Sequence, residues 1–170
     1  MAIITLNNNS ISNITSLPTG VGGKVLQVVT DEVSSEVSTT STSYTDITGL
    51  SVSITPSSTS SKIYVIANLC GCRTNSTNHV ECNSFYNIVR NSTELTASRL
   101  SYGASNANAN RKVSGTITLT NLDEPNTTSA TTYKCQFKAK SGDGQTARIN
   151  ESTDNTPVSS ITVMEISEWL

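Results

Sequence analysis

The chain has 170 residues and a formal net charge of −2, from 11 basic and 13 acidic side chains. Electrostatic binding of nucleic acid needs a strongly basic surface, so this balance excludes that class of protein and argues against a polybasic membrane-surface protein as well. Ser, Thr and Asn fill 70 positions, with 27, 26 and 17 copies, and the high content of β-branched residues argues against disorder.

Residues 1–23 differ in pattern from the rest of the chain. Their apolar residues follow no steady period, and Gly20, Gly22 and Gly23 form a flexible joint at their end. We interpret residues 1–23 as an extended attachment arm and residues 24–170 as one head domain. No apolar run approaches the roughly 18 residues of a membrane-spanning helix, and the first residues have neither the basic nor the apolar region of a secretory signal, so we expect assembly in a cytoplasm without membrane insertion.

From Lys24 onward, short alternations of apolar and polar residues between turn residues predict β-strands only. About nine strands are expected: 24–33, 44–54, 62–72, 79–90, 94–102, 112–121, 131–140, 145–150 and 159–168. Short strands at such even spacing, without helical periodicity, are typical of all-β folds. We therefore predict an antiparallel β-sandwich that resembles a jelly roll.

Two of these strands are apolar on both faces. In 62–72, Ile63, Val65, Ala67 and Leu69 oppose Tyr64, Ile66, Cys70 and Cys72, and in 159–168, Ile161 and Val163 oppose Met164 and Ile166. One face meets the core, and the other needs cover from another subunit or from the arm. We favour another subunit, with the oligomer interface at Tyr64, Ile66, Met164 and Ile166.

The sequence gives little indication of catalysis. His79 is the only histidine, and no Gly-x-Ser-x-Gly motif accompanies it. Four acids in predicted loops could pair for glycoside hydrolysis, although solvated charge is the commoner role of such acids: Asp123, Glu124, Glu151 and Asp154. We therefore expect no enzyme activity and no cofactor.

The four cysteines do not have the spacing of a metal site. Cys70, Cys72, Cys82 and Cys135 form no Cys-x-x-Cys pair, and their spacing with His79 is unlike that of zinc ribbons or fingers. We expect no metal, and reduced thiols that pack as small hydrophobic residues. If strands 62–72 and 79–90 form a hairpin around residue 76, Cys70 and Cys82 lie opposite each other.

Alternate loops of an antiparallel fold lie at opposite ends. If the arm enters at one end, the loops 34–43, 73–78, 103–111 and 141–144 lie at the far end, and 55–61, 91–93, 122–130 and 151–158 lie at the arm end. The far loops mix small polar residues with cationic and aromatic ones, which suits either adaptable recognition or plain solvation. The candidate receptor-contact residues are Arg73, Asn75, His79, Tyr102 and Arg111.

Several segments resemble a β-rich module found in tail fibres and virion appendages of tailed bacteriophages, of the kind common in marine and cyanobacterial phages. These are GKVLQVV at 23–29, TSTSYTDITGLSVSITP at 40–56, SSKI at 60–63, TSATTYK at 128–134 and SITVMEI at 160–166. The resemblance covers about residues 23–166 and is weakest over 70–112.

This resemblance implies a homotrimeric structural protein of the virion surface. The arm 1–23 would bind other virion proteins, and the head would contact a glycan or a protein of the host surface. The leading interpretation is a short tail fibre or appendage. A capsid decoration or head-fibre protein is the alternative, and a glycan depolymerase is a third hypothesis.

Overall fold

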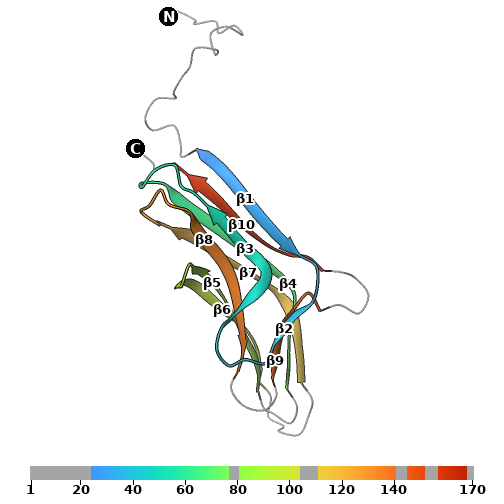
Figure 1. The fold of residues 1–170 in the computed structure, drawn as a ribbon. Helices are drawn as coiled ribbons and strands as arrows, with labels where there is room; N and C mark the ends of the chain where they lie inside the picture. The colour runs from blue at the N-terminus through green and yellow to red at the C-terminus, as the bar shows by residue number, and fades with distance from the viewer. Residues whose placement is uncertain (1–23, 77–80, 104–110, 141–144, 152–156, 168–170) are drawn as a thin grey trace, which may run out of the picture.

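The computed structural model describes residues 24–76, 81–103, 111–140, 145–151 and 157–167, and there the chain consists of β-strands and their connections (Figure 1). The strands are β1 (Val25–Val33), β2 (Val37–Thr39), β3 (Thr45–Ile54), β4 (Lys62–Ser76), β5 (Glu81–Arg90), β6 (Thr93–Gly103), β7 (Arg111–Asp123), β8 (Thr131–Ala139), β9 (Thr146–Ile149) and β10 (Ser159–Ile166). The expected all-β class is confirmed. The arm 1–23 and His79 lie outside the described residues.

The strands form two antiparallel sheets. One has the order β1-β10-β4-β9-β2, with β7 on the other side of β4, and the second has the order β3-β8-β5-β6. The inner faces of the two sheets meet in one hydrophobic core, whose largest fully buried side chains include Tyr86, Tyr133 and Phe137. The sandwich expected from the sequence is therefore confirmed.

Two long ribbons of the six-stranded sheet are each interrupted, so that each is divided into two strands: β1 and β2 form one ribbon, and β9 and β10 form the other. The strands β1 and β2 pair with β10 and β9 respectively, and both β9 and β10 run antiparallel to β4. Counted as single ribbons, β1/β2 is the first of eight ribbons and β9/β10 the last. The first ribbon then pairs with the eighth, the second with the seventh, the third with the sixth and the fourth with the fifth. This is the order of a long antiparallel ribbon rolled into two sheets, which is a jelly roll.

The roll also corrects the expected hairpin between 62–72 and 79–90. The third and fourth ribbons, β4 and β5, lie in different sheets, and the partner of Cys82 is Tyr102 in β6. Cys70 and Cys82 are therefore not opposite each other. The expected hairpin assumed that consecutive strands pair. In a jelly roll, two ribbons pair when they lie equally far along the chain from the central turn, which here joins β5 to β6.

A bulge in β4 corrects the side assigned to Cys72. The register of β4 against β7 shifts between Leu69 and Cys72, and Gly71 there adopts a φ of +54°. A Cβ on Gly71 would lie 2.9 Å from the carbonyl oxygen of Glu151, so a side chain has no room. Because the bulge adds one residue, Leu69 and Cys72 both face the core, whereas Cys70 is half-buried on the outer face.

The same region shows that one loop was assigned to the wrong end of the sandwich. The segment 151–158 was expected at the arm end, but the Glu151 amide donates to the carbonyl oxygen of Gly71, halfway along β4. The sequence pattern counted β9 and β10 as successive antiparallel strands. They instead run in the same direction along one edge of β4, and Glu151 and Pro157 both lie beside Gly71 rather than near the start of β1.

Candidate functional site

The outer side of the six-stranded sheet carries a row of apolar side chains across four strands. Val28 of β1 pairs with Met164 of β10, Met164 with Tyr64 of β4, and Tyr64 with Leu122 of β7. Residues directly opposite on adjacent strands lie on the same face with their side chains close together. The four side chains therefore form one continuous apolar row, although they come from distant parts of the chain.

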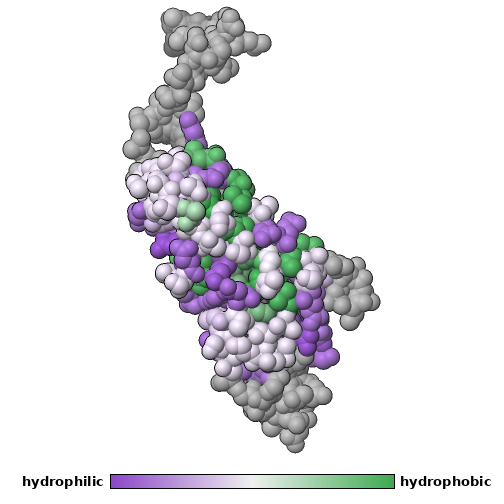
Figure 2. All heavy atoms as spheres, in the orientation of Figure 1, coloured by the Kyte–Doolittle hydropathy of each residue, from purple (hydrophilic) through white to green (hydrophobic). Residues whose placement is uncertain are grey.

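We call the apolar area around this row the outer patch, made up of Val25, Leu26, Val28, Tyr64, Ile66, Leu122, Met164 and Ile166. The sheet edge β1 and the strand β7 carry its most exposed members, since Val25, Val28 and Leu122 are 56%, 55% and 51% exposed. Figure 2 shows hydrophobic surface along β1, toward the end where the chain enters the sheet. Apolar side chains that gather on one face mark an interaction surface more strongly than scattered ones do.

The outer patch has polar borders. Beyond Ile66, the next row along the sheet is Ser160, Asn68 and Thr118, and the Thr118 hydroxyl donates to Oδ1 of Asn68 at 3.1 Å. At the opposite border, the Lys62 ammonium lies 2.8 Å from the Glu124 carboxylate. An apolar centre with a polar rim is the usual composition of a protein–protein interface.

The structure brings together all four residues that the sequence analysis assigned to an oligomer interface. Met164 lies opposite Tyr64, while Ile66 and Ile166 lie in the neighbouring rows. Sequence reasoning missed Val28 and Leu122. Each lies far along the chain from its partner in the row, so only the pairing register shows that these two residues extend it.

Three of the predicted receptor-contact residues, Asn75, Tyr102 and Arg111, lie toward the end of the sandwich opposite the start of β1. Asn75 of β4 pairs with Lys112, and Arg111 opens β7 opposite Ser76. Tyr102 lies near the end of β6, in the other sheet, opposite Cys82. Their shared receptor role stays a prediction.

Arg73 differs from the expectation of a loop residue. It lies within β4 and forms an ion pair with Glu151, and its side chain is only 17% exposed. To contact a receptor, the Arg73 guanidinium would have to leave this carboxylate.

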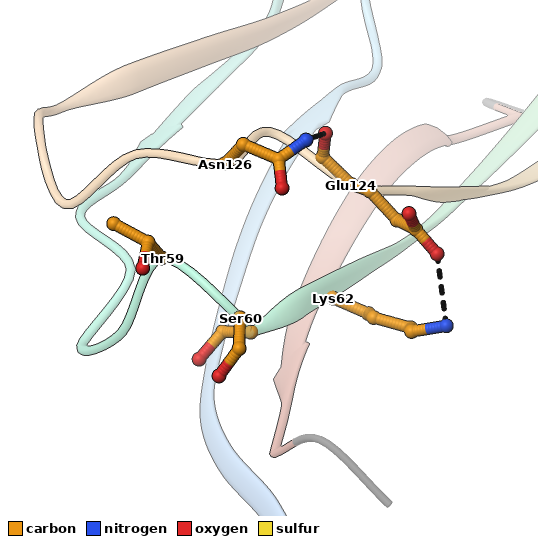
Figure 3. Close-up of a pocket in the computed structure, with 6 residues that line it drawn as sticks. Thr59, Ser60, Lys62, Glu124 and Asn126 are labelled. Atoms are coloured by element: carbon orange, nitrogen blue, oxygen red, sulfur yellow. Dashed lines mark hydrogen bonds and ion pairs between the residues drawn. The ribbon is translucent and has the colours of Figure 1, made fainter.

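A polar pocket of about 330 Å³ lies near the start of β4 (Figure 3). It is lined by Thr59, Ser60, Ser61, Lys62, Glu124 and Asn126. Lys62 and Glu124 pair across one side, and Nδ2 of Asn126 donates to the carbonyl oxygen of Glu124 at 2.9 Å. The hydrogen bond and charge of Lys62 lower the pKa of Glu124. The two charges offset each other, so the pocket offers hydrogen bonds without favouring an acidic or a basic ligand.

The acids considered for glycoside hydrolysis have cationic partners where the structure describes them. Asp123 is buried and accepts from Nη1 of Arg90 at 2.8 and 2.9 Å and from the Tyr133 hydroxyl at 2.6 Å. Glu124 pairs with Lys62, and Glu151 pairs with Arg73. These contacts give the three acids structural roles, and Asp154 lies outside the described residues.

The cysteines described in the structure do not gather at one point. Cys72 and Cys135 are buried in the core, and burial raises the pKa of each thiol to about 12. Cys70 is half-buried on the other side of its sheet, and all three are free thiols. Within the described ranges, no group of three or more His, Cys, Asp or Glu side chains is placed to hold a metal ion. Nor does the described part contain a helix long and apolar enough to cross a membrane.

No family model matches the chain, and a search of curated proteins finds no match.

Proposed function

We propose that this chain is a structural protein of a bacteriophage virion, in a short tail fibre or appendage. The arm 1–23 binds other virion proteins, and the β-sandwich head points outward for attachment to the host surface. The resemblance of residues 23–166 to tail-fibre modules supports this proposal. The jelly-roll strand order agrees with it, since this architecture is frequent in viral capsid and lectin domains.

The observation that carries the proposal is the outer patch. A row from Val28 to Leu122 spans four strands, and its two end members are more than half exposed. Burying this row between copies of the chain removes apolar area from water, at roughly 25 cal/mol per Å². The chain then acts as a homo-oligomer, and the resemblance to tail-fibre modules makes the oligomer a trimer.

The patch also relates the oligomer to the arm. The amide of Ser167 donates to the carbonyl oxygen of Lys24, so the described chain enters the sheet beside the end of β10 and next to Val25. In an oligomer formed through the outer patch, the copies of the arm would leave from neighbouring points. Such a bundle of arms suits attachment to one place on a particle.

A capsid decoration or head-fibre protein is the alternative function, because the same head could be anchored to the capsid instead of the tail. A glycan depolymerase is a weaker alternative. Release of reducing sugars from host polysaccharide by the isolated protein would favour the depolymerase.

Immunogold labelling of intact phage particles with an antibody against this chain tests the location. Gold at the tail or at an appendage supports the leading proposal, and gold over the capsid supports the decoration protein. Particles that lack the chain, checked by mass spectrometry of purified virions, would overturn both.

A further inference from the structure

The outer face of the four-stranded sheet carries a row in which aromatic and cationic side chains alternate. Phe85 of β5 pairs with Lys138 of β8 on one side and with Arg99 of β6 on the other. Tyr44 continues the row, because it precedes Thr45, whose partner Phe137 precedes Lys138. The order across the sheet is therefore Tyr44, Lys138, Phe85 and Arg99.

Lys138 contacts both aromatic rings. Its ammonium nitrogen lies 4.4 Å from the centre of the Tyr44 ring and 5.3 Å from the centre of the Phe85 ring. Both distances are within the range of a cation–π interaction. A ring fixed in this way loses less conformational freedom when a ligand binds, so the aromatic surface is preorganised.

Beside the rings lies a shallow pocket of about 240 Å³, lined by Tyr44, Phe85, Ala97, Ser98 and Arg99. The small side chains of Ala97 and Ser98 leave room between the rings and β6. The pocket therefore joins aromatic surface to a guanidinium in an open hollow.

The nearby carboxylates do not occupy Arg99. Glu94 accepts a hydrogen bond from Nδ2 of Asn87 at 2.7 Å, and Asp46 pairs with Lys134 and also accepts from Gln136. Within the part of the chain that the structure describes, Arg99 has neither an ion pair nor a side-chain hydrogen bond. Its five N–H donors are left for a ligand, in the planar fork that suits a carboxylate.

We propose that this pocket binds an acidic sugar unit of a surface polysaccharide. The faces of Tyr44 and Phe85 carry negative charge density, and they attract the weakly positive C–H groups of a pyranose ring. Arg99 binds the carboxylate of the sugar by charge-assisted hydrogen bonds, and the positive charge of Lys138 supports it. A shallow, open pocket suits one unit within a long glycan chain better than it suits an enclosed cofactor.

This proposal rests on the proposed function in one point only, namely that the ligand is a glycan of the host surface. The site differs from the far-end residues predicted from sequence, because it lies on the outer face of the four-stranded sheet. It also lies on the opposite side of the sandwich from the outer patch, so an oligomer formed through that patch leaves the pocket exposed.

Calorimetric titration of the full chain tests the site. The acidic probe is a hexasaccharide of alternating glucuronate and N-acetylglucosamine, and the neutral probe is a hexasaccharide of glucose. We expect the acidic probe to bind at least about tenfold more tightly than the neutral one, which corresponds to about 1.4 kcal/mol. Equal affinity for the two probes, or binding of neither, would overturn the proposal.

Three variants identify the residues that bind. Arg99→Ala should weaken binding of the acidic probe about tenfold or more, and Phe85→Leu should weaken binding of both probes. Lys112→Ala removes the same charge from an exposed position on the other sheet, so it should leave binding unchanged. Equal losses for Arg99→Ala and Lys112→Ala would show a general charge effect and would contradict the site.

A thermal unfolding curve for each variant separates loss of the site from loss of the fold. Arg99 is exposed on the edge strand β6, so its replacement should leave the melting temperature unchanged. Titration of the isolated chain does not depend on where the protein sits in a particle. Binding without virion labelling would overturn the proposed function and keep the site, whereas virion labelling without binding would overturn only the site.

Discussion

Asn150 donates a hydrogen bond from Nδ2 to the carbonyl oxygen of Val33 at 2.7 Å, which joins the interruption after β9 to the end of β1. Nδ2 also donates to the carbonyl oxygen of Ser35 at 3.1 Å, and Oδ1 accepts from the Ser159 hydroxyl at 2.7 Å. The same hydroxyl accepts from the Cys70 amide, next to the bulge of β4. One buried side chain therefore ties together the irregular points of three neighbouring ribbons.

Replacing Asn150 should destabilise the fold. Asn150→Ala removes three hydrogen bonds, of which the one from the Ser159 hydroxyl is buried and the two to the Val33 and Ser35 carbonyls are partly buried, and it keeps a φ of +55° that alanine disfavours. We expect a loss of about 2–4 kcal/mol in the free energy of unfolding, measured by urea denaturation. Asn150→Gly relieves only the backbone strain, so it should recover a small part of the loss. An alanine variant within about 0.5 kcal/mol of wild type would contradict this role.

Glu165 should make stability depend on pH in the acid range. Its side chain is fully buried; burial raises the pKa, but hydrogen bonds from Ser57, Ser61 and Gln27 outweigh this and bring the pKa down to about 2. Because the pKa of Glu165 is lower in the folded than in the unfolded chain, its carboxylate stabilises the fold at any pH above the pKa of the unfolded chain. This stabilisation disappears as the pH falls toward 2.

The test compares wild type with Glu165→Gln. We expect wild type to be more stable by roughly 3 kcal/mol at pH 6 to 7, and this difference to shrink as the pH falls from about 4.5 to 2. Chemical denaturation at a series of pH values measures it. Glu32→Gln removes an exposed carboxylate from β1 and serves as the control. A difference between wild type and Glu165→Gln that stays constant with pH would contradict the assignment.

Asp123 should be more important for stability than the exposed acids. Asp123, at the end of β7, accepts hydrogen bonds from Arg90 of β5 and from the Tyr133 hydroxyl of β8, so it joins the two sheets. Asp123→Asn leaves the half-buried guanidinium without its charge partner, and we expect a loss of about 3 kcal/mol. Asp46→Asn breaks the exposed pair with Lys134 and should cost less than about 1 kcal/mol. Thermal unfolding compares the two variants, and equal losses would contradict the proposed link between the sheets.

A charge placed in the outer patch should prevent oligomer formation. Met164→Asp would bury an unpaired carboxylate between copies, at a cost of several kcal/mol, so the proposed oligomer should dissociate to single chains. Thr118→Asp adds the same charge to the same sheet face at an exposed position in the polar border, so its oligomer should persist. Light scattering after gel filtration measures the mass. A monomeric wild type, or a Met164→Asp variant that keeps the oligomeric mass, would overturn the interface.

Local sequence patterns determined the composition of the two faces of each strand. Residues 131–140 alternate between apolar and polar in the sequence, and in the structure Tyr133, Cys135 and Phe137 face the core while Lys134, Gln136 and Lys138 face outward. The second apolar face of 62–72 likewise predicted Tyr64 and Ile66 on the outer side. These predictions succeed because side-chain direction along a strand has a period of two residues and needs no knowledge of the neighbouring strand.

Only the tertiary structure decided which strands are neighbours. Pairing in a jelly roll joins segments far apart in the chain, so Val28 reaches Met164, and Tyr44, Lys138, Phe85 and Arg99 come into one row. No local pattern marks such partners. The bulge at Gly71 and the interruptions at Asn150 were also beyond the sequence pattern, because a single extra residue reverses every later side-chain direction in a strand. The sequence alone therefore determined what each strand buries, and the rolled pairing determined which exposed residues lie together as surfaces.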